Sequence, residues 1–245
     1  MHAVREKFNV NIFESSNLIG GRCRSFFEKK LNLEIDNGNH LVFSANENFY
    51  ELCRLVDSCS TVKKLPPYFQ FYDLKNNHHW DFDFSNRGVM DLFLNKKTIP
   101  NSNFIDFFSV LKFLFVAKQK TVKELVGNSK IFSTLWDPLT LGVMNTSSEL
   151  ASARILSNVL KKTIFKGERY CHIYQPKKNW NDSIINPCKI FLNKSGCEIN
   201  LKNILKKIEI KDNHVTELKF INKIVSVKKN DIVLLAIPPS NFIKF

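Results

Sequence analysis

The sequence lacks the usual marks of a metal site and of a membrane-spanning segment. Its six cysteines form no Cys-x-x-Cys pair and have no histidine at metal-ligand spacing, which argues against a zinc site or a redox dithiol. The most apolar stretch, residues 104–117, contains Asp106 and Lys112 and is too short to cross a bilayer. Residues 1–7 are polar and charged, so no signal peptide is expected. We therefore expect a cytoplasmic protein with reduced thiols and no bound metal.

Acidic residues are also scarce relative to basic ones, which gives a net charge of +13. A charge of this size raises nucleic acid or an anionic membrane surface as partners, because clustered lysines and arginines pair with phosphate. Here the lysines are scattered in separated doublets among many Asn, Ile and Phe residues, with no continuous basic face and no stacking motif. An AT-rich coding sequence explains this composition, so we predict no nucleic-acid binding.

The apolar pattern favours a mixture of strands and helices around a real core, since 44% of the 245 residues are hydrophobic. Residues 9–13 are typical of a short buried strand that ends at Glu14, and residues 31–35 of a second strand that runs into a turn. Residues 46–56 have apolar side chains at helical spacing. Further short strands, separated by charged turns, are expected at 198–201, 205–210, 214–220 and 232–237.

The middle of the chain is richer in aromatic residues and predicts two helices, 104–118 and 148–162. On the first helix, apolar side chains at i, i+3, i+4, i+7 and i+11 form a stripe: Phe104, Phe107, Phe108, Leu111 and Phe115. Such a stripe is typical of a helix that packs on a core. The lining of an apolar substrate tunnel and contact with a membrane are the alternatives.

The sharpest local signal follows the first expected strand. Glu14, at the strand end, is placed to accept hydrogen bonds from the ribose hydroxyls of an adenosine. Gly20 and Gly21 let the backbone approach a diphosphate, and Arg22 and Arg24 can meet its charge. This set resembles the flavin amine oxidase/phytoene desaturase superfamily, in which a strand-end Glu is followed by a Gly-Gly-Arg motif that covers FAD. A solvated strand end and an ordinary glycine loop are the bland alternatives.

Further segments resemble one branch of that superfamily, the squalene-associated FAD-dependent desaturases. They lie, in the family's order, at residues 35–41, 135–139, 144–146, 151–153 and 232–239, so the resemblance covers about residues 4–240. It implies more cofactor-binding positions: Asp36, Asn37, Gly38, Leu205 through its backbone, and Pro238. It also makes His40 a candidate proton donor near the flavin. By themselves, residues 36–38 are equally a tight turn and an isolated histidine is more often structural.

The resemblance implies an α/β fold, with an incomplete FAD/NAD(P)-binding Rossmann-like domain and an inserted α+β substrate domain. We expect the first part of the FAD-binding domain at 1–57, the substrate-binding insertion at 58–186 and the return segment at 187–245. The family begins with a strand and a Gly-x-Gly-x-x-Gly turn that holds the pyrophosphate, and this sequence does not contain them. We therefore expect a fragment, or the product of a shortened or split gene, that binds FAD poorly without a complementary fragment.

The activity implied by the resemblance is that of an FAD-dependent oxidoreductase acting on a long, apolar isoprenoid. The most specific expectation is reductive dehydroxylation of hydroxysqualene to squalene in hopanoid-type triterpenoid synthesis. The alternatives are a carotenoid (phytoene-type) desaturase or an amine oxidase on the same fold, and a non-catalytic remnant or partner subunit. Because such a substrate resides in lipid, peripheral contact with the inner face of the membrane is also expected.

Overall fold

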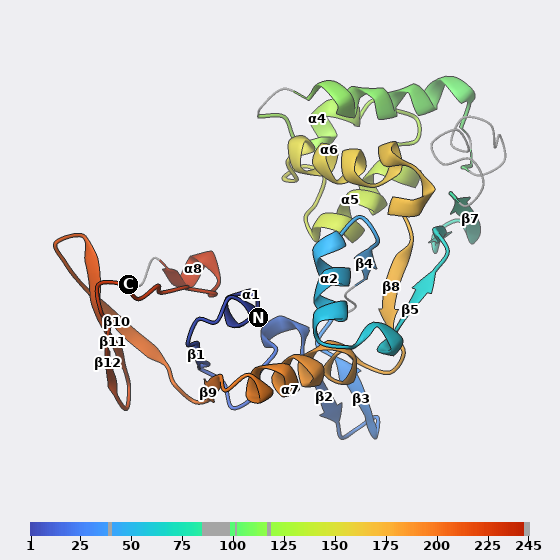
Figure 1. Ribbon diagram of the computed structural model, residues 1–245. Coiled ribbons are helices and arrows are strands. Elements are labelled where there is room, and N and C mark those ends of the chain that lie inside the picture. Colours follow the sequence, from blue (N-terminus) through green and yellow to red (C-terminus); the bar gives the residue numbers. More distant parts are fainter. Residues whose placement is uncertain (39–40, 85–98, 101, 117–118, 243–245) are drawn as a thin grey trace. The chain divides into compact units, whose positions relative to one another are not determined.

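The computed structural model describes residues 1–38, 41–84, 99–100, 102–116 and 119–242 (Figure 1). The chain forms two compact units. Unit 1 comprises Met1–Asn39, Val56–Thr61 and Lys178–Phe245, and unit 2 comprises His40–Leu55 and Val62–Lys177. Residues 40–55, expected with the first part of the FAD-binding domain, thus belong to unit 2, together with most of the expected insertion. The assignment of a function to each domain stays a prediction.

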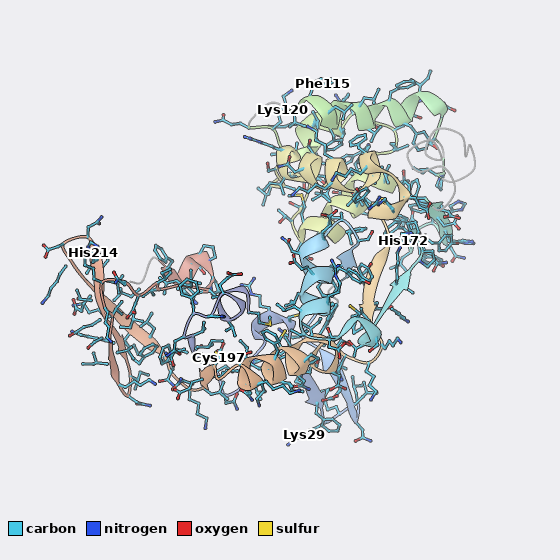
Figure 2. All side chains as sticks on the ribbon, in the orientation of Figure 1. Lys29, Phe115, Lys120, His172, Cys197 and His214 are labelled. Atoms are coloured by element: carbon cyan, nitrogen blue, oxygen red, sulfur yellow. The ribbon has the colours of Figure 1, made fainter. Side chains whose placement is uncertain are left out.

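The centre of unit 1 is a parallel pair of strands, β1 (Asn11–Phe13) and β9 (Glu198–Asn200), with Phe13 opposite Asn200. The short helix α1 (His2–Arg5) precedes β1, and α7 (Asn186–Lys194) leads through the buried Cys197 into β9 (Figure 2). Parallel neighbours need a crossover connection, and the last element of this connection before β9 is α7. The π-helical turn η7 (Asn181–Ile185) runs directly into α7, whose first turn contains Pro187.

Unit 1 also contains two antiparallel elements. The hairpin of β2 (Ser25–Glu28) and β3 (Leu33–Asp36) pairs Ser25 with Asp36. The sheet of β10 (Leu205–Lys211), β11 (His214–Phe220) and β12 (Ile224–Ser226) turns between its first two strands at Asp212 and Asn213. Both turn residues have positive φ, which suits the tight turns of hairpins. The last described element of the chain is the short helix α8 (Pro239–Phe242).

The strand expected at 232–237 is not formed, which makes that expectation wrong. Within the described residues no strand pairs with this segment, and Ile232 and Leu234 are 72% and 81% exposed. A run of β-branched and aliphatic residues favours extended backbone, but a strand also needs a neighbour that accepts its hydrogen bonds.

Unit 2 contains a small sheet and a hairpin rich in aromatic residues. In the sheet, β8 (Ile173–Pro176) lies between β4 (Val42–Phe43) and β5 (Val62–Leu65), antiparallel to both. The hairpin pairs β6 (Tyr68–Asp73) with β7 (His78–Asp83). Alternate residues of a strand point to opposite faces, so one face carries Phe69, Phe71, Trp80 and Phe82, and the rings of Phe71 and Trp80 stack 5.7 Å apart.

The helices of unit 2 enclose its core. They are α2 (Glu47–Leu55), the 3-10 helix η3 (Phe104–Phe115), α4 (Val122–Val126), the π-helical turn η4 (Phe132–Trp136), α5 (Asp137–Met144) and α6 (Ala153–Lys162). Two 3-10 turns, η5 (Ile164–Lys166) and η6 (Glu168–Tyr170), connect α6 to β8, and η2 (Cys59–Thr61) of unit 1 precedes β5. Helix α6 packs against η3, α4 and α5, as Figure 1 shows.

The apolar stripe expected on the Phe-rich helix is only partly right. The side chains of Phe107, Val110 and Phe113 are 4%, 2% and 0% exposed, whereas Phe108 and Phe115 are 45% and 87% exposed. A 3-10 helix has three residues per turn, so the buried side chains recur every third residue instead of at the α-helical spacing. The second expected helix begins at Ala153, later than predicted, because Ser152 forms an isolated β-bridge to Thr121.

Two general features hold for the part of the chain that the structure describes. None of its helices is both long and apolar enough to cross a membrane. It also contains no group of three or more His, Cys, Asp or Glu side chains that could hold a metal ion.

Candidate functional site

Glu14 lies at the carboxyl end of β1, where ligands bind in open α/β sheets. Its backbone is fixed on both sides: its N–H donates to the Asn200 carbonyl at 2.9 Å, and its carbonyl accepts from the Asn203 N–H at 2.8 Å. Its carboxylate accepts the N–H of Ser16 at 2.8 Å. Glu14 is therefore a partly buried acceptor held at the strand end that sequence reasoning selected.

The two glycines that follow differ in what surrounds them. Gly20 has φ +102°, and a Cβ at this position would lie 3.1 Å from Cγ1 of Ile185 and 3.2 Å from Cβ of Arg24. Gly21, the first residue of η1 (Gly21–Cys23), has φ +54°, and no atom lies within 4 Å of where its Cβ would be. Gly20 therefore permits close packing against η7, whereas Gly21 borders open space that another group can approach.

The arginines of this loop connect Glu14 to the turn after β3. Arg24 donates from Nη1 to Oγ of Ser16 at 3.0 Å, beside the Glu14 carboxylate. Asn37 donates its N–H to the Arg24 carbonyl at 3.0 Å and its side-chain amide to the Arg22 carbonyl at 3.3 Å. The structure thus brings together the strand end, the glycine loop and the 36–38 turn, which lie within 25 residues of one another in the sequence.

The Asp36 carboxylate makes structural hydrogen bonds. Its Oδ1 accepts the Ser25 hydroxyl at 2.6 Å and the N–H of Trp180 at 2.9 Å, which ties the β2–β3 hairpin to the start of η7. Asn181 completes the connection, because its side chain accepts the N–H of Ser25 and donates to the Ser25 carbonyl, both at 3.0 Å. Burial, and then the charge of Asp36, raises the pKa of the neighbouring Cys23 thiol.

Sequence reasoning did not identify Asn181 or Ser25 as important. The available signal was the polar run that precedes α7, from Asn179 to Ser183, which is typical of a helix start. That run does not reveal that its partner lies more than a hundred residues earlier in the chain, at Ser25.

The remaining predicted positions differ in whether they lie near the end of β1. Leu205 begins β10 two residues after Asn203, whose N–H binds the Glu14 carbonyl, so it lies at the same end of β1. Gly38 follows Asn37 in the turn. Pro238 accepts the N–H of Asn241 through its carbonyl, and among the described residues no hydrogen bond joins it to the glycine loop. His40 lies outside the described residues.

A cationic side chain at this end of the sheet was also missed. Lys223 donates from Nζ to Oδ1 of Asn200 at 2.9 Å and lies 4.6 Å from the ring centroid of Phe13. The Phe13 ring in turn packs against Phe220, with 4.7 Å between centroids. Lys223 follows β11 in sequence and belongs to no motif. Only the tertiary structure shows that its charge lies beside Phe13 and Asn200, the pair of residues next to Glu14.

Unit 2 contains an apolar cavity of about 60 Å³. It lies between the β6–β7 hairpin and helices η4, α5 and α6. Its lining residues are Phe43, Phe69, Phe71, Phe82, Phe84, Val110, Leu135, Trp136, Leu139, Val143, Leu156, Val159, Leu160, Thr163, Ile164 and Cys171. None of these described residues is charged, so the cavity suits a hydrocarbon rather than an ion.

The few polar atoms in the cavity wall are neutral or already hydrogen-bonded. The Thr163 hydroxyl donates to the Val159 carbonyl at 2.8 Å, and Nε1 of Trp136 donates to Oγ of Ser109 at 2.9 Å. Burial, and then the Glu168 carboxylate, raises the pKa of the Cys171 thiol to about 11, so this thiol is neutral at physiological pH. The wall therefore offers a guest molecule mainly dispersion contacts.

Residues 4–242 match the family described as flavin containing amine oxidoreductase. The chain belongs to this family. It is similar to the hydroxysqualene dehydroxylase of Zymomonas mobilis subsp. mobilis, with 30% identity over 232 residues, 94% of this chain and 56% of that protein. It is 27% identical over 233 residues to the hydroxysqualene dehydroxylase of Sinorhizobium fredii, again 94% of this chain and 56% of that protein. The chain thus spans about half the length of the curated relatives it matches.

Solved structures show the same fold at low sequence identity. An oxidoreductase from Methanosarcina mazei superposes with a TM-score of 0.65 at 13% identity, over 92% of this chain and 53% of that one. A reduced UDP-galactopyranose mutase superposes with a TM-score of 0.55 at 14% identity, over 91% of this chain and 50% of that one. These likenesses confirm the expected α/β fold of the FAD-binding Rossmann-like class.

The residues around Glu14 fit the nucleotide half of the flavin cofactor that is typical of the flavin amine oxidoreductase family. A carboxylate at a strand end suits ribose hydroxyls, and guanidinium groups suit phosphate oxygens. The open space beside Gly21 leaves room for a close approach of the backbone. Asp36, in contrast, has a carboxylate oxygen engaged by Ser25 and Trp180, so its evident contribution is to hold the loop in position.

Proposed function

We propose that this chain forms part of an FAD-dependent oxidoreductase that converts hydroxysqualene to squalene by reductive dehydroxylation. The observation that carries the proposal is the uncharged cavity of unit 2, whose wall is aromatic and aliphatic. Hydroxysqualene dehydroxylases are among the relatives that cover 94% of the chain, which supports the same substrate class. The setting would be hopanoid-type triterpenoid synthesis.

We assign the nucleotide part of FAD to the carboxyl end of β1. Glu14 would accept the ribose hydroxyls, Gly20 and Gly21 would shape the loop at the diphosphate, and Arg22 and Arg24 would offset its charge. The 36–38 turn would support this loop, and the backbone of Leu205 would meet the adenine. Pro238 remains a proposed contact from sequence alone. When bound and reduced, FAD would supply the hydride that replaces the substrate hydroxyl, which leaves as water after taking up a proton.

The cavity distinguishes this proposal from its rivals. An amine substrate would have to place a cation among uncharged side chains, and burial of an unpaired charge costs several kcal/mol or more. A long hydrocarbon carries no charge, so contact with the uncharged wall of the cavity has no such cost. A carotenoid-type desaturase would accept a similar substrate, and only the product separates the two.

The role of this chain within the enzyme is also a proposal. Unit 2 would supply the substrate-binding insertion, and unit 1 part of the FAD-binding domain. The chain spans about half the length of these relatives, and a complementary polypeptide that provides further FAD-binding elements is a proposed partner. A non-catalytic remnant or partner subunit is the alternative. Because the substrate resides in lipid, we also propose a cytoplasmic location at the inner face of the membrane.

The cavity can be tested by filling it. Val143 of α5 lines the cavity, whereas Leu141 on the same helix is 57% exposed and does not. V143W should weaken squalene binding to the purified chain by roughly tenfold or more, because overpacking costs about 1–3 kcal/mol, and L141W should bind like the wild type. Equal binding by both variants would contradict the cavity assignment.

The reaction itself is tested with the assembled enzyme. Anaerobic incubation with reduced FAD and hydroxysqualene should yield squalene, identified by mass spectrometry. Formation of a more unsaturated product under oxidising conditions, with no squalene, would favour the desaturase instead. No turnover in the presence of the complementary polypeptide would favour the non-catalytic alternative.

A further inference from the structure

The outward side of η3 carries a continuous row of apolar side chains. We call it the outer row: Ile105, Phe108, Leu111 and Leu114. The first three are 76%, 45% and 40% exposed, and Leu114 is partly exposed. Residues three apart eclipse one another on a 3-10 helix with about 2 Å rise per residue, so the row is about 18 Å long. At its end, Phe115 is 87% exposed.

The helix is held so that this row must face outward. The opposite side packs Phe107, Val110 and Phe113 into the core of unit 2. Ser157 of α6 donates its hydroxyl to the Phe113 carbonyl at 2.5 Å, and Trp136 donates to Ser109. Rotating η3 to hide the outer row would break both bonds and expose buried aromatic rings. The exposure of the outer row is therefore a stable feature of the unit.

Lysines flank the outer row. Lys112 is exposed on η3 itself, and Lys161 of α6 donates from Nζ to the Leu114 carbonyl at 3.1 Å. Figure 2 places Lys120 and Phe115 at the same outer edge of unit 2. The nearby Asp106 accepts the N–H of Asn103 at the helix start, and none of the described carboxylates forms an ion pair with these lysines. The face thus combines apolar side chains with lysines that form no ion pair with a described carboxylate.

We propose that the outer row and Phe115 dock this protein on an anionic lipid bilayer. Aromatic and aliphatic side chains bordered by lysines are the pattern of helices that lie in a membrane interface: the apolar groups enter the acyl boundary and the lysines meet anionic headgroups. Two pockets of unit 2 are not lined by any residue of the outer row, so the row lies outside both. This docking surface gives a structural basis for the proposed location at the membrane. It rests on the proposed function, because the lipid-resident substrate is the reason that the enzyme would need a bilayer.

The test uses the full chain and sucrose-loaded vesicles of phosphatidylcholine, with or without phosphatidylglycerol. The wild type should sediment with the anionic vesicles, less with the neutral ones, and less again as salt is raised. The double variant F108S/F115S should lower the vesicle partition coefficient by about a hundredfold, because it removes both aromatic side chains from the acyl boundary. K112E/K120E should lower binding to anionic vesicles only.

Controls separate docking from other effects. Leu74, in the turn of the β6–β7 hairpin, is 88% exposed, so L74S removes an exposed apolar side chain elsewhere on unit 2 and should bind like the wild type. Circular dichroism checks that each variant is folded. Equal vesicle binding by F108S/F115S and the wild type, or no wild-type binding to any vesicle, overturns the proposal. So does a dimer that F108S/F115S dissociates without any vesicle binding, because the face would then be a protein interface. Vesicle binding needs neither flavin nor substrate, so its failure is distinct from failure of the proposed reaction.

Discussion

Substitution of the two loop glycines by alanine should have different effects on stability. G20A places a Cβ at φ +102°, 3.1 Å from Ile185 and 3.2 Å from Arg24. Strained backbone costs about 1–3 kcal/mol and overpacking about 1–3 kcal/mol, so we expect a loss on the order of 3 kcal/mol. G21A has φ +54° and open space, so only the left-handed backbone penalty of about 1–2 kcal/mol remains.

Thermal unfolding followed by circular dichroism measures the difference. For a chain of this size each kcal/mol shifts Tm by about 2–4 °C, so G20A should lower Tm by roughly 6–12 °C and G21A by roughly 2–8 °C. In the flavin-loaded enzyme G21A should weaken FAD binding more than G20A does, because the added methyl group of G21A enters the space left for the diphosphate. Equal Tm values for the two variants, or a more stable G20A, would refute the packing argument.

Three other predictions concern the core and its polar supports. F113A should cost about 3–5 kcal/mol and F115A almost nothing in urea unfolding, and similar costs would contradict the 3-10 register of η3. N181A should cost about 1–3 kcal/mol, because it leaves the buried backbone groups of Ser25 without partners; a neutral result would show that water replaces them. At pH 8 the thiolate fraction of Cys171 should be roughly a hundredfold below that of an ordinary thiol, measured by iodoacetamide labelling and mass spectrometry.

The raised pKa of Cys171 also makes stability depend on alkaline pH. The buried neutral thiol contributes stability that is fully present below its ordinary pKa of 9.0 and is lost as pH rises through about 11. C171A should flatten the fall in stability over that window, and an unchanged fall would assign it to another group.

Much of unit 1 follows from local pattern. A short β-branched run, a strand-end carboxylate and a glycine pair predict β1, Glu14 and the loop, because strand propensity and glycine conformation act within a few residues. The strand at 198–201 follows from the same kind of reasoning and the α/β class from the family resemblance, whereas its parallel pairing with β1 comes from the structure. The role of Asp36 in binding Ser25 and Trp180 could not be read in this way, because both partners are set by the packing of η7.

The sequence by itself therefore determined the chemistry available at the end of β1 and the apolar character of the middle segment. Only the tertiary structure decided which aromatic side chains are buried, because η3 has three residues per turn and places Phe113 against Trp136. It also decided that residues 232–237 pair with no strand in the part of the chain that the structure describes, and that Lys223 lies beside Phe13. Local propensity acts through neighbours in the chain, whereas hydrogen-bond partners and cavity walls come from residues distant in sequence, and only the folded chain brings these together.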